Sequence, residues 1–231
     1  MPKRRRKGDK MALLVRAEFD LVQDHRGLFF GVYKSVIKRA MDLLAVALLA
    51  VPVCIVVGIL ALIVARDGKS PFYIQKRLGR GGRVFSMVKL RSMVANADQI
   101  LDAYLAENPE EAREWNEKQK LMNDPRITPV GKLIRKTSLD ELPQLWNVLM
   151  GDMSLVGPRP IMVGQKTIYP SDAYYDLRPG ITGPWQVSAR NESSFAERAD
   201  YDADYLDGLS LSKDARIMFQ TVGVVVNATG H

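Results

Sequence analysis

Two adjacent carboxylates, Asp140 and Glu141, stand in the run RKTSLDELPQLWNVLMGDMSLVGPRP, with Arg135 before them and Arg159 at its far end. One carboxylate of such a pair can act as an oxygen nucleophile while the other binds a hard divalent cation. Arginine guanidinium groups suit two-point binding of phosphate. These residue types together predict phosphoryl chemistry at a nucleotide-like pyrophosphate.

A purely structural interpretation of the same acids is also available. Ser138 and Glu141 have the spacing of a capping box, and Asp140 alone is a good N-cap residue. This interpretation does not explain why arginines occur on both sides of the acids. The two interpretations are compatible, because a helix N-terminus can keep a carboxylate ionised and can help hold a phosphate dianion.

The capping interpretation requires a helix that begins near Ser138. Apolar residues continue from there at helical spacing, which predicts a packed stripe, and Pro143 is acceptable only in the first turn. The stripe consists of Leu142, Leu145, Trp146 and Leu149.

A second group of basic residues lies in SPFYIQKRLGRGGRVFSMVKLRSM, residues 70–93. Two alternating stretches joined by a glycine-rich turn predict a short β-hairpin. Without a Walker-type lysine spacing, the glycines are better explained by the turn than by phosphate binding. Lys89 and Arg91 alternate onto one strand face, which makes both of them candidates for the site.

Histidine and cysteine are too scarce for several other chemistries. The chain has two histidines, His25 and His231, and a single cysteine, Cys54, inside an apolar run. A Cys/His zinc site, a Cys–His nucleophile pair and a disulfide framework are therefore not expected.

Residues 43–65 form an uncharged apolar stretch of 23 residues, long enough to cross a bilayer at about 20 residues. Pro52 falls near its middle, where proline kinks or breaks a helix. Basic residues flank both ends, so the positive-inside rule gives a span no direction. We expect a helix that breaks at Pro52 and returns to the same face of the membrane; a kinked single span is the alternative.

Charge is divided unevenly along the chain. Residues 1–91 carry 19 Lys/Arg and 6 Asp/Glu, whereas the remainder carries 14 and 20. A basic front end around an apolar segment predicts contact with an anionic membrane surface, and we expect no cleaved signal peptide. A nucleic-acid role lacks a supporting motif.

The rest of the chain predicts mainly helices. Residues 94–121 are expected to be helical, with a solvated acidic face and a break at Asn108–Pro109. Residues 211–231 are expected to form an amphipathic packing or interfacial helix.

Several motifs together resemble those of the bacterial sugar transferase family, the monotopic phosphoglycosyl transferases. The resemblance covers about residues 35–207 and rests on KRAMD at 38–42, the Pro-interrupted apolar helix, the hairpin run and the Asp-Glu run. It extends through RPGITGPWQVSARN and the spacing Arg198, Asp202, Tyr205. The short form is also similar to galactose-transferring members of succinoglycan-type systems.

The resemblance implies roles for particular residues. Asp140 would be the nucleophile, Glu141 would bind Mg²⁺, and Pro52 would be the membrane break. The implied phosphate- and nucleotide-binding residues are Lys89, Arg91, Arg135, Arg159 and Arg190.

The resemblance also implies a reaction. A hexose 1-phosphate, with galactose favoured, would pass from a UDP-sugar to undecaprenyl phosphate through an aspartyl intermediate, with release of UMP. The implied setting is the bacterial inner membrane, with the catalytic domain facing the cytoplasm and membrane lipids as further partners. The apolar segment and the terminal helix could each support a homodimer.

We therefore expect an α+β fold, mainly α, with a membrane re-entrant helix and a small cytoplasmic catalytic domain that contains a short β-hairpin. The expected divisions are a basic tail (1–33), the re-entrant helix (34–66), the catalytic domain (67–210) and the C-terminal helix (211–231). Two rival functions are a non-catalytic membrane-tethered scaffold or regulator that binds lipid or nucleic acid, and a glycosyl transferase that releases UDP.

Overall fold

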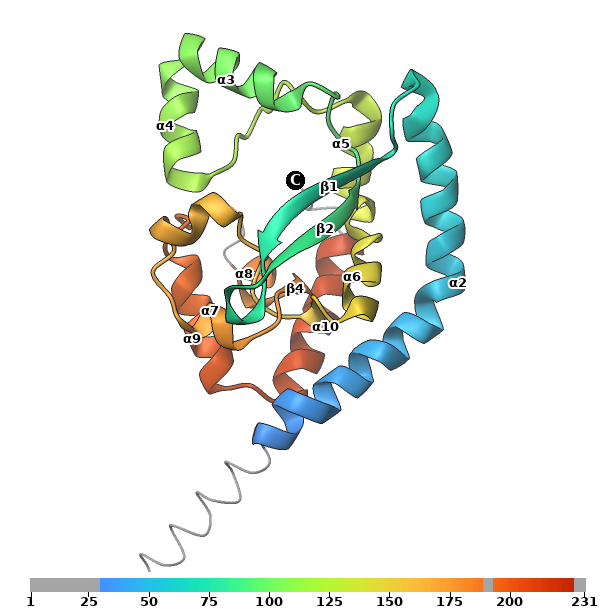
Figure 1. Cartoon of the computed structure of the whole chain (residues 1–231), viewed down its shortest axis with the longest axis vertical. Helices are drawn as coiled ribbons and strands as arrows, with labels where there is room; N and C mark the ends of the chain where they lie inside the picture. Colours follow the sequence, from blue (N-terminus) through green and yellow to red (C-terminus); the bar gives the residue numbers. More distant parts are fainter. Residues whose placement is uncertain (1–29, 189–192, 227–231) are drawn as a thin grey trace, which may run out of the picture.

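The computed structural model describes residues 30–188 and 193–226 of the chain. Helices predominate, and the strands of the described residues form two small pairs (Figure 1). The α-helices are α2 (Lys38–Val64), α3 (Ala97–Glu107), α4 (Pro109–Lys118), α5 (Pro129–Lys136), α6 (Gln144–Met150), α7 (Ala173–Asp176), α8 (Pro184–Val187), α9 (Arg198–Asp207) and α10 (Leu211–Val226). The shorter helical turns are η1 (Tyr33–Ile37), η2 (Ala65–Asp67), η3 (Arg80–Gly82), η4 (Leu139–Glu141) and η5 (Val163–Ile168).

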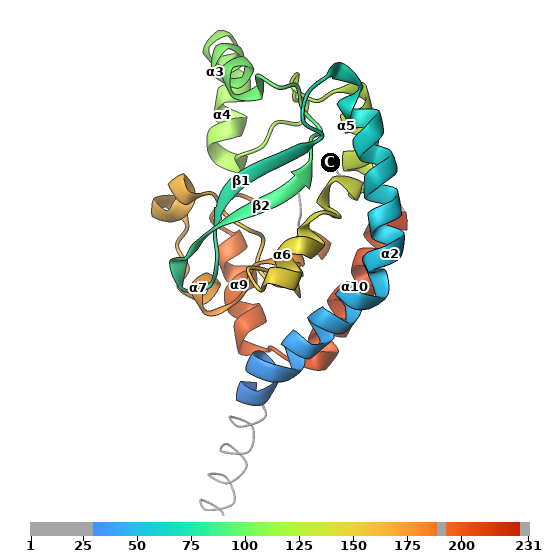
Figure 2. The same cartoon turned by 45° about the vertical axis from the view of Figure 1, so that its right-hand side comes forward.

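The long helix α2 contains most of the apolar segment. It passes through Pro52 without ending, so the predicted break at this proline is wrong at the level of secondary structure. Figures 1 and 2 show the helix changing direction part-way along its length. A bend is the expected effect of a residue that lacks a backbone N–H and whose ring crowds the preceding turn.

One face of α2 has no protein against it. The helical segment Phe30–Asp67 is long and apolar enough to cross a membrane by length and composition, and only 6% of its most apolar window is buried. Leu48, Val51 and Leu62 each expose 70% or more of their surface. Such an apolar face is unusual in water and is typical of contact with lipid or protein.

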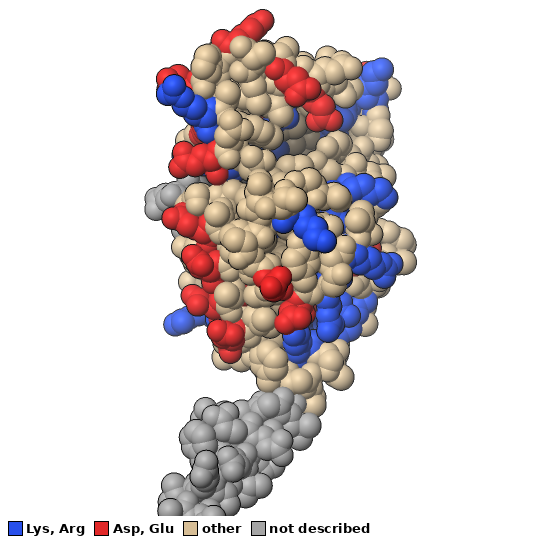
Figure 3. Space-filling model, turned by 60° about the vertical axis from the view of Figure 1, so that its left-hand side comes forward, with Lys and Arg blue, Asp and Glu red and all other residues tan. Residues whose placement is uncertain are grey.

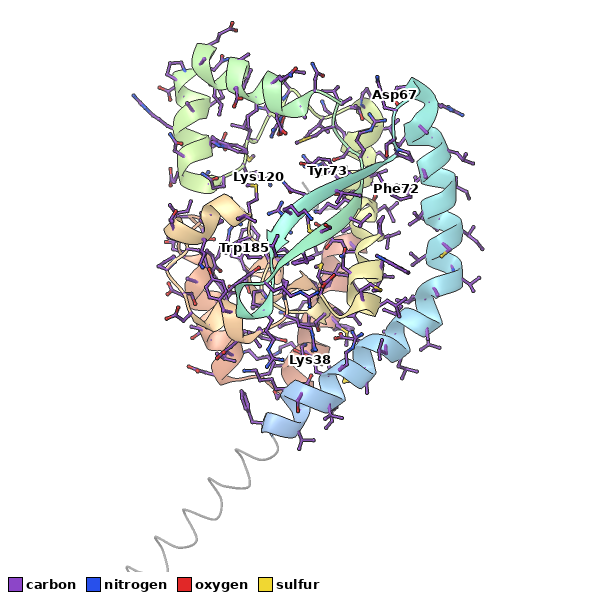
Figure 4. The ribbon with its side chains drawn as sticks, in the orientation of Figure 1. Lys38, Asp67, Phe72, Tyr73, Lys120 and Trp185 are labelled. Atoms are coloured by element: carbon purple, nitrogen blue, oxygen red, sulfur yellow. The ribbon has the colours of Figure 1, made fainter. Side chains whose placement is uncertain are left out.

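Both ends of α2 are tied to the rest of the protein. At its start, Lys38 forms an ion pair with Asp214 of α10 and donates to the Tyr205 hydroxyl at 3.1 Å. Past its other end, in η2, Asp67 pairs with Arg91 at 2.7 Å. Figure 4 shows Lys38 and Asp67 at opposite ends of this segment.

The predicted hairpin is confirmed. Strands β1 (Phe72–Leu78) and β2 (Val84–Leu90) pair antiparallel, with Tyr73 opposite Lys89 and Arg77 opposite Phe85. Gly81 and Gly82 both have positive φ in the connecting turn, a conformation that glycine adopts without steric cost.

The helical segment after the hairpin also agrees with the prediction. α3 ends at Glu107 with Asn108 as its C-cap, and Pro109 begins α4 at the first helical position, where proline is tolerated. Neither helix buries a residue. Figure 1 shows both of them apart from the other helices, as expected of helices with a solvated acidic face. On the face seen in Figure 3, acidic side chains gather along one edge and basic side chains along the other.

The region after Ser138 differs from the prediction. Ser138 has a left-handed backbone and makes no side-chain cap, so the capping-box interpretation is wrong. A 3-10 turn, η4, is followed by α6, and the expected apolar stripe does not form the packed face. Leu145 is buried, but Trp146 is 58% exposed because polar Gln144 and Asn147 face inward instead.

Most buried apolar side chains of the described residues form three clusters that join the helices to the hairpin. One joins η1 to α9 and α10 around Tyr205, one joins α2, β2 and α6 around Val148, and one joins β1 to α7 and α9 around Tyr174. The C-terminal helix α10 contributes the buried residue Ile217 and the partly buried Met218 to the first cluster, while its residue Phe219 is 82% exposed. The helix therefore has both a packed and an apolar uncovered face.

The second strand pair positions the Gly-Pro-Arg-Pro loop. β3 (Ser154–Val156) and β4 (Gly180–Thr182) run parallel. A Cβ on Gly180 would lie 2.1 Å from the Gly157 nitrogen, so only glycine allows this approach of the two backbones. Arg159 follows two residues after Gly157 and is thereby held beside β4.

Candidate active site

The Asp140–Glu141 pair lies in η4, between α5 and α6. Helix α6 is fastened to β2 by Asn147, whose side-chain oxygen accepts from the Val88 N–H at 3.1 Å and whose amide donates to the Ser86 carbonyl at 2.8 Å. This contact sets the acidic turn beside the strand that contains Lys89.

Glu141 is the point on which the basic side chains converge. Lys89 Nζ donates to Glu141 Oε1 at 2.7 Å, and Arg159 reaches the same oxygen at 3.6 Å. The three side chains come from β2, the Gly-Pro-Arg-Pro loop and η4, which are far apart in sequence. Hence two of the predicted phosphate ligands do meet at the predicted acidic pair.

Asp140 is more deeply buried than its neighbour, with 6% of its surface exposed. Burial raises the pKa of its carboxyl group, and the charge of Glu141 raises it further, while Lys89 and the two arginines Arg135 and Arg159 act in the opposite direction. A three-residue turn provides little helix dipole, so the expected help from a helix N-terminus is absent here.

Arg135 lies in the last turn of α5, just before the acidic turn. Burial lowers the pKa of its guanidinium, and the charge of Asp140 is the strongest influence that opposes this shift. Arg135 therefore belongs to the electrostatic surroundings of Asp140, although the structure gives the two side chains no direct hydrogen bond.

Arg91 has different partners from the other candidate residues. Its guanidinium pairs with Asp67, and it also donates to the carbonyl oxygens of Ser70 and Val64. These contacts fasten the end of α2 to the hairpin. The predicted residue Arg190 lies outside the described residues, and Pro52 lies within α2.

A pocket opens beside Glu141. Basic and polar side chains on its wall come from β1, β2, η4, α6 and the Gly-Pro-Arg-Pro loop, and Met87, Pro160, Gly180 and Ile181 complete it. The charged and polar lining residues are Arg77, Lys89, Glu141, Gln144 and Arg159. Asp140 is not among them.

The sequence prediction missed Arg77 and Gln144. Arg77 lies four residues after Tyr73 and therefore on the same face of β1, and Tyr73 pairs with Lys89, so strand periodicity could have placed Arg77 on the face that bears Lys89. Gln144 carried no signal, because a glutamine at the start of a helix is unremarkable in sequence.

The motif containing Arg198, Asp202 and Tyr205 contributes to the site and to the core. The guanidinium of Arg198 stacks on Trp185 at 4.0 Å, and Arg159 approaches the same ring at 5.9 Å. Asp202 accepts a hydrogen bond from the Tyr169 hydroxyl, and burial raises the pKa of Asp202 to about 7. Tyr205 belongs to the buried network around Lys38.

The described side chains do not form a complete metal site by themselves. The described residues contain no group of three histidine, cysteine or acidic side chains that could hold an ion. Glu141 supplies one carboxylate at the pocket wall. Mg²⁺ commonly binds through one or two carboxylates plus substrate phosphates, so this donor set fits an ion that arrives with a substrate.

Comparison with known proteins gives consistent matches. The sequence profile of the family described as "Bacterial sugar transferase" matches residues 33–228. The chain is 47% identical over 199 residues to a UDP-galactose-lipid carrier transferase of Erwinia amylovora, covering 84% of this chain and 41% of that protein. It is 49% identical over 169 residues to an undecaprenyl-phosphate galactose phosphotransferase of Salmonella typhimurium, covering 72% of this chain and 36% of that protein.

A shorter relative is covered almost fully. The exopolysaccharide production protein ExoY of Rhizobium meliloti is 43% identical over 198 residues, which cover 84% of this chain and 87% of that protein. The chain thus spans less than half the length of the Erwinia and Salmonella proteins but most of the Rhizobium one.

Proposed function

Because the chain belongs to the bacterial sugar transferase family, we propose that it transfers a hexose 1-phosphate from a UDP-sugar to undecaprenyl phosphate and releases UMP. This reaction would be the first membrane step of exopolysaccharide biosynthesis. Two relatives whose names specify galactose support galactose as the sugar.

The observation that carries this proposal is the convergence of Lys89 and Arg159 on Glu141, next to the buried Asp140. Preorganised cations at an acidic pair suit the transfer of a phosphoryl group, since charge on the transferred group is stabilised by fixed donors. A scaffold protein would have no need to hold a carboxylate among these cations.

The proposed reaction has two displacements at one phosphorus atom. A carboxylate oxygen of Asp140 attacks the β-phosphorus of the UDP-sugar, and the bond between this phosphorus and the bridging oxygen breaks, so UMP leaves. A phosphate oxygen of undecaprenyl phosphate then attacks the same phosphorus, and the bond to Asp140 breaks. The carboxylate is regenerated, and the product is a sugar–diphospho–undecaprenol.

The basic side chains would bind and orient the substrates. Arg159 and Lys89 would exchange part of their contact with Glu141 for oxygens of the pyrophosphate, and Arg135 would favour the ionised form of Asp140. Mg²⁺, held by Glu141 and substrate oxygens, would supply charge neutralisation at the pyrophosphate. Contacts of this kind are often incomplete until the substrate binds.

The attachment of α2 at both ends supports a re-entrant position in the membrane. Its start is bound to α9 and α10, and the turn after its end is bound to Arg91, so both ends belong to one globular body. We propose that the bent, uncovered middle of α2 enters one leaflet of the inner membrane and that the body lies on the cytoplasmic side. The site would then face both a soluble nucleotide and a lipid phosphate.

Nucleotide release tests the reaction. Purified protein in detergent or nanodiscs is incubated with a panel of UDP-sugars and Mg²⁺, with and without undecaprenyl phosphate. We expect UMP release with one sugar, stimulation by the lipid, and loss in Asp140→Asn. Release of UDP would instead indicate simple glycosyl transfer, and no release with any sugar would favour the scaffold function.

Cysteine labelling tests the membrane position. Cys54, the single cysteine, is first replaced by alanine, and single cysteines are then introduced next to Lys38 and next to Lys69. A membrane-impermeant reagent should label both positions from the cytoplasmic side alone. Labelling from opposite sides would establish a single span.

A further inference from the structure

Two buried donors in the pocket have no partner among the described residues. They are Nε of Arg77 and Nε2 of Gln144. Gln144 is only 2% exposed, and both side chains line the pocket beside Glu141. Buried polar groups are almost always hydrogen-bonded in native proteins, so two unpaired donors in one pocket indicate a missing acceptor.

Arg77 is held in place although its Nε is unpaired. One terminal nitrogen donates to the Pro160 carbonyl at 3.0 Å, and the other donates to the Gln75 side chain. These contacts fix the plane of the guanidinium before any ligand binds. A preorganised guanidinium loses little freedom when it binds an anion.

The charge of the pocket favours an anion. Lys89 and Arg159 share the single carboxylate of Glu141, whereas Arg77 forms no ion pair with a described residue. Burial and the charge of Arg159 lower the pKa of Arg77 to about 10, so it is still cationic at neutral pH. Among the described lining residues, three cations therefore face one carboxylate, so this part of the pocket can accept a ligand with two negative charges.

We propose that Arg77 and Gln144 form a subsite for a phosphate monoester, which is occupied in turn by the leaving UMP and by the phosphate of the polyprenyl acceptor. This inference rests on the proposed two-step function. It assigns binding roles to two residues that the sequence did not single out.

The geometry of the reaction explains why one subsite would serve both ligands. In each displacement the entering and leaving oxygens lie in line on opposite sides of the phosphorus. Asp140 is the entering group in the first step and the leaving group in the second. The UMP oxygen that leaves and the lipid phosphate oxygen that enters must therefore occupy the same position opposite Asp140, and both belong to phosphate monoesters.

Binding measurements test the subsite directly. The variants are Arg77→Gln and Gln144→Met, and the matched control is Lys76→Gln, which removes a cation from the exposed neighbouring position of β1. The probes are UMP and uridine, and a short-chain polyprenyl phosphate and its polyprenol. We expect each variant to weaken the binding of UMP and of polyprenyl phosphate at least tenfold and by similar factors. The affinities of the variants for uridine and polyprenol, and all affinities of the control, should change less than twofold.

Three results would overturn the proposal. They are unchanged UMP affinity in both variants, weaker binding of only one of UMP and polyprenyl phosphate, or equally weakened binding of the probes that lack phosphate. Should Arg77→Gln fail to fold, Gln144→Met keeps the size of the side chain and still decides the question. Gln144→Glu should weaken UMP binding more than Gln144→Met does, because the new carboxylate would repel the phosphate. A residue with only a packing role would not show this difference.

Failure of the proposed function can be distinguished from failure of this inference. Exchange of labelled UMP into a UDP-sugar without lipid acceptor reports the first displacement in the wild-type protein. Absence of exchange with every sugar would contradict the proposed reaction, whereas the comparison of UMP with uridine would still measure the phosphate subsite. Normal exchange with unchanged UMP affinity in both variants would contradict the subsite alone.

Discussion

Lys38 and Arg77 are both largely buried cations with polar neighbours, and they differ in how completely their side chains are hydrogen-bonded. Asp214 accepts hydrogen bonds from Lys38, from the Tyr33 hydroxyl at 2.6 Å and from the Tyr205 hydroxyl. In the pocket, Arg77 keeps an unpaired Nε and has no carboxylate partner among the described residues. A complete set of partners indicates a group that holds the fold together, and an incomplete set indicates a group that waits for a ligand.

This comparison separates effects on activity from effects on stability. Substitutions in the pocket should reduce turnover while the fold is retained, and substitutions around Lys38 should reduce stability while each folded molecule remains active.

The largest effect is expected for Asp140→Asn. Loss of the proposed nucleophile should reduce turnover by about 10⁴-fold or more, with an unchanged unfolding temperature, because the amide keeps the shape of the buried carboxyl. Asp176→Asn, at a side chain that is 65% exposed, is the matched control and should be fully active. Substantial activity in Asp140→Asn would remove Asp140 from the nucleophile role.

Lys38→Met should act on stability. Removing one partner leaves Asp214 buried without its counter-charge, which typically costs about 3–5 kcal/mol of unfolding free energy. Thermal or denaturant unfolding in detergent measures this loss, and activity per folded molecule should be retained at low temperature. The double variant Lys38→Met with Asp214→Leu should recover part of the stability. A loss below about 1 kcal/mol in Lys38→Met would mean that this network does not anchor α2.

Arg159→Gln and Arg91→Gln test whether partners distinguish two arginines that the sequence treated alike. Arg159 faces Glu141, and its loss should reduce turnover by roughly 10²–10³-fold, as for other groups that stabilise a transition state. Arg91 faces Asp67, so its loss should reduce turnover by less than about threefold, since no contact to substrate is removed. An equal loss of turnover in both variants would mean that Arg91 also binds phosphate.

The smallest effect concerns the pH dependence of stability through Asp202. Burial raises its pKa in the folded state to about 7, above its value in the unfolded chain. The folded state therefore holds a proton that the unfolded chain has already lost, and stability decreases as pH rises through 7. Between about pH 6 and pH 8 the unfolding free energy should fall by about 1.4 kcal/mol more in the wild type than in Asp202→Asn. Parallel pH curves for the two proteins would mean that Asp202 titrates normally.

Local elements were predictable because their signals are local. Alternating residues joined by a glycine-rich turn predicted the hairpin, and Asn108–Pro109 predicted the division between α3 and α4. The prediction of a packed apolar stripe after Ser138 was wrong because packing depends on the tertiary structure. Trp146 and Leu149 are exposed because polar Gln144 and Asn147 take the inward positions of α6, and apolar spacing alone does not show which face of a helix packs.

The sequence by itself determined the acidic pair, the basic residues around it and the apolar segment that a membrane could accept. Only the tertiary structure decided that Lys89 reaches Glu141 whereas Arg91, two residues later, reaches Asp67. The strand ends at Leu90, so the alternation that predicts a shared face no longer holds for Arg91. The role of a charged side chain depends on which partner lies within a few ångströms, and residues distant in sequence supply that partner.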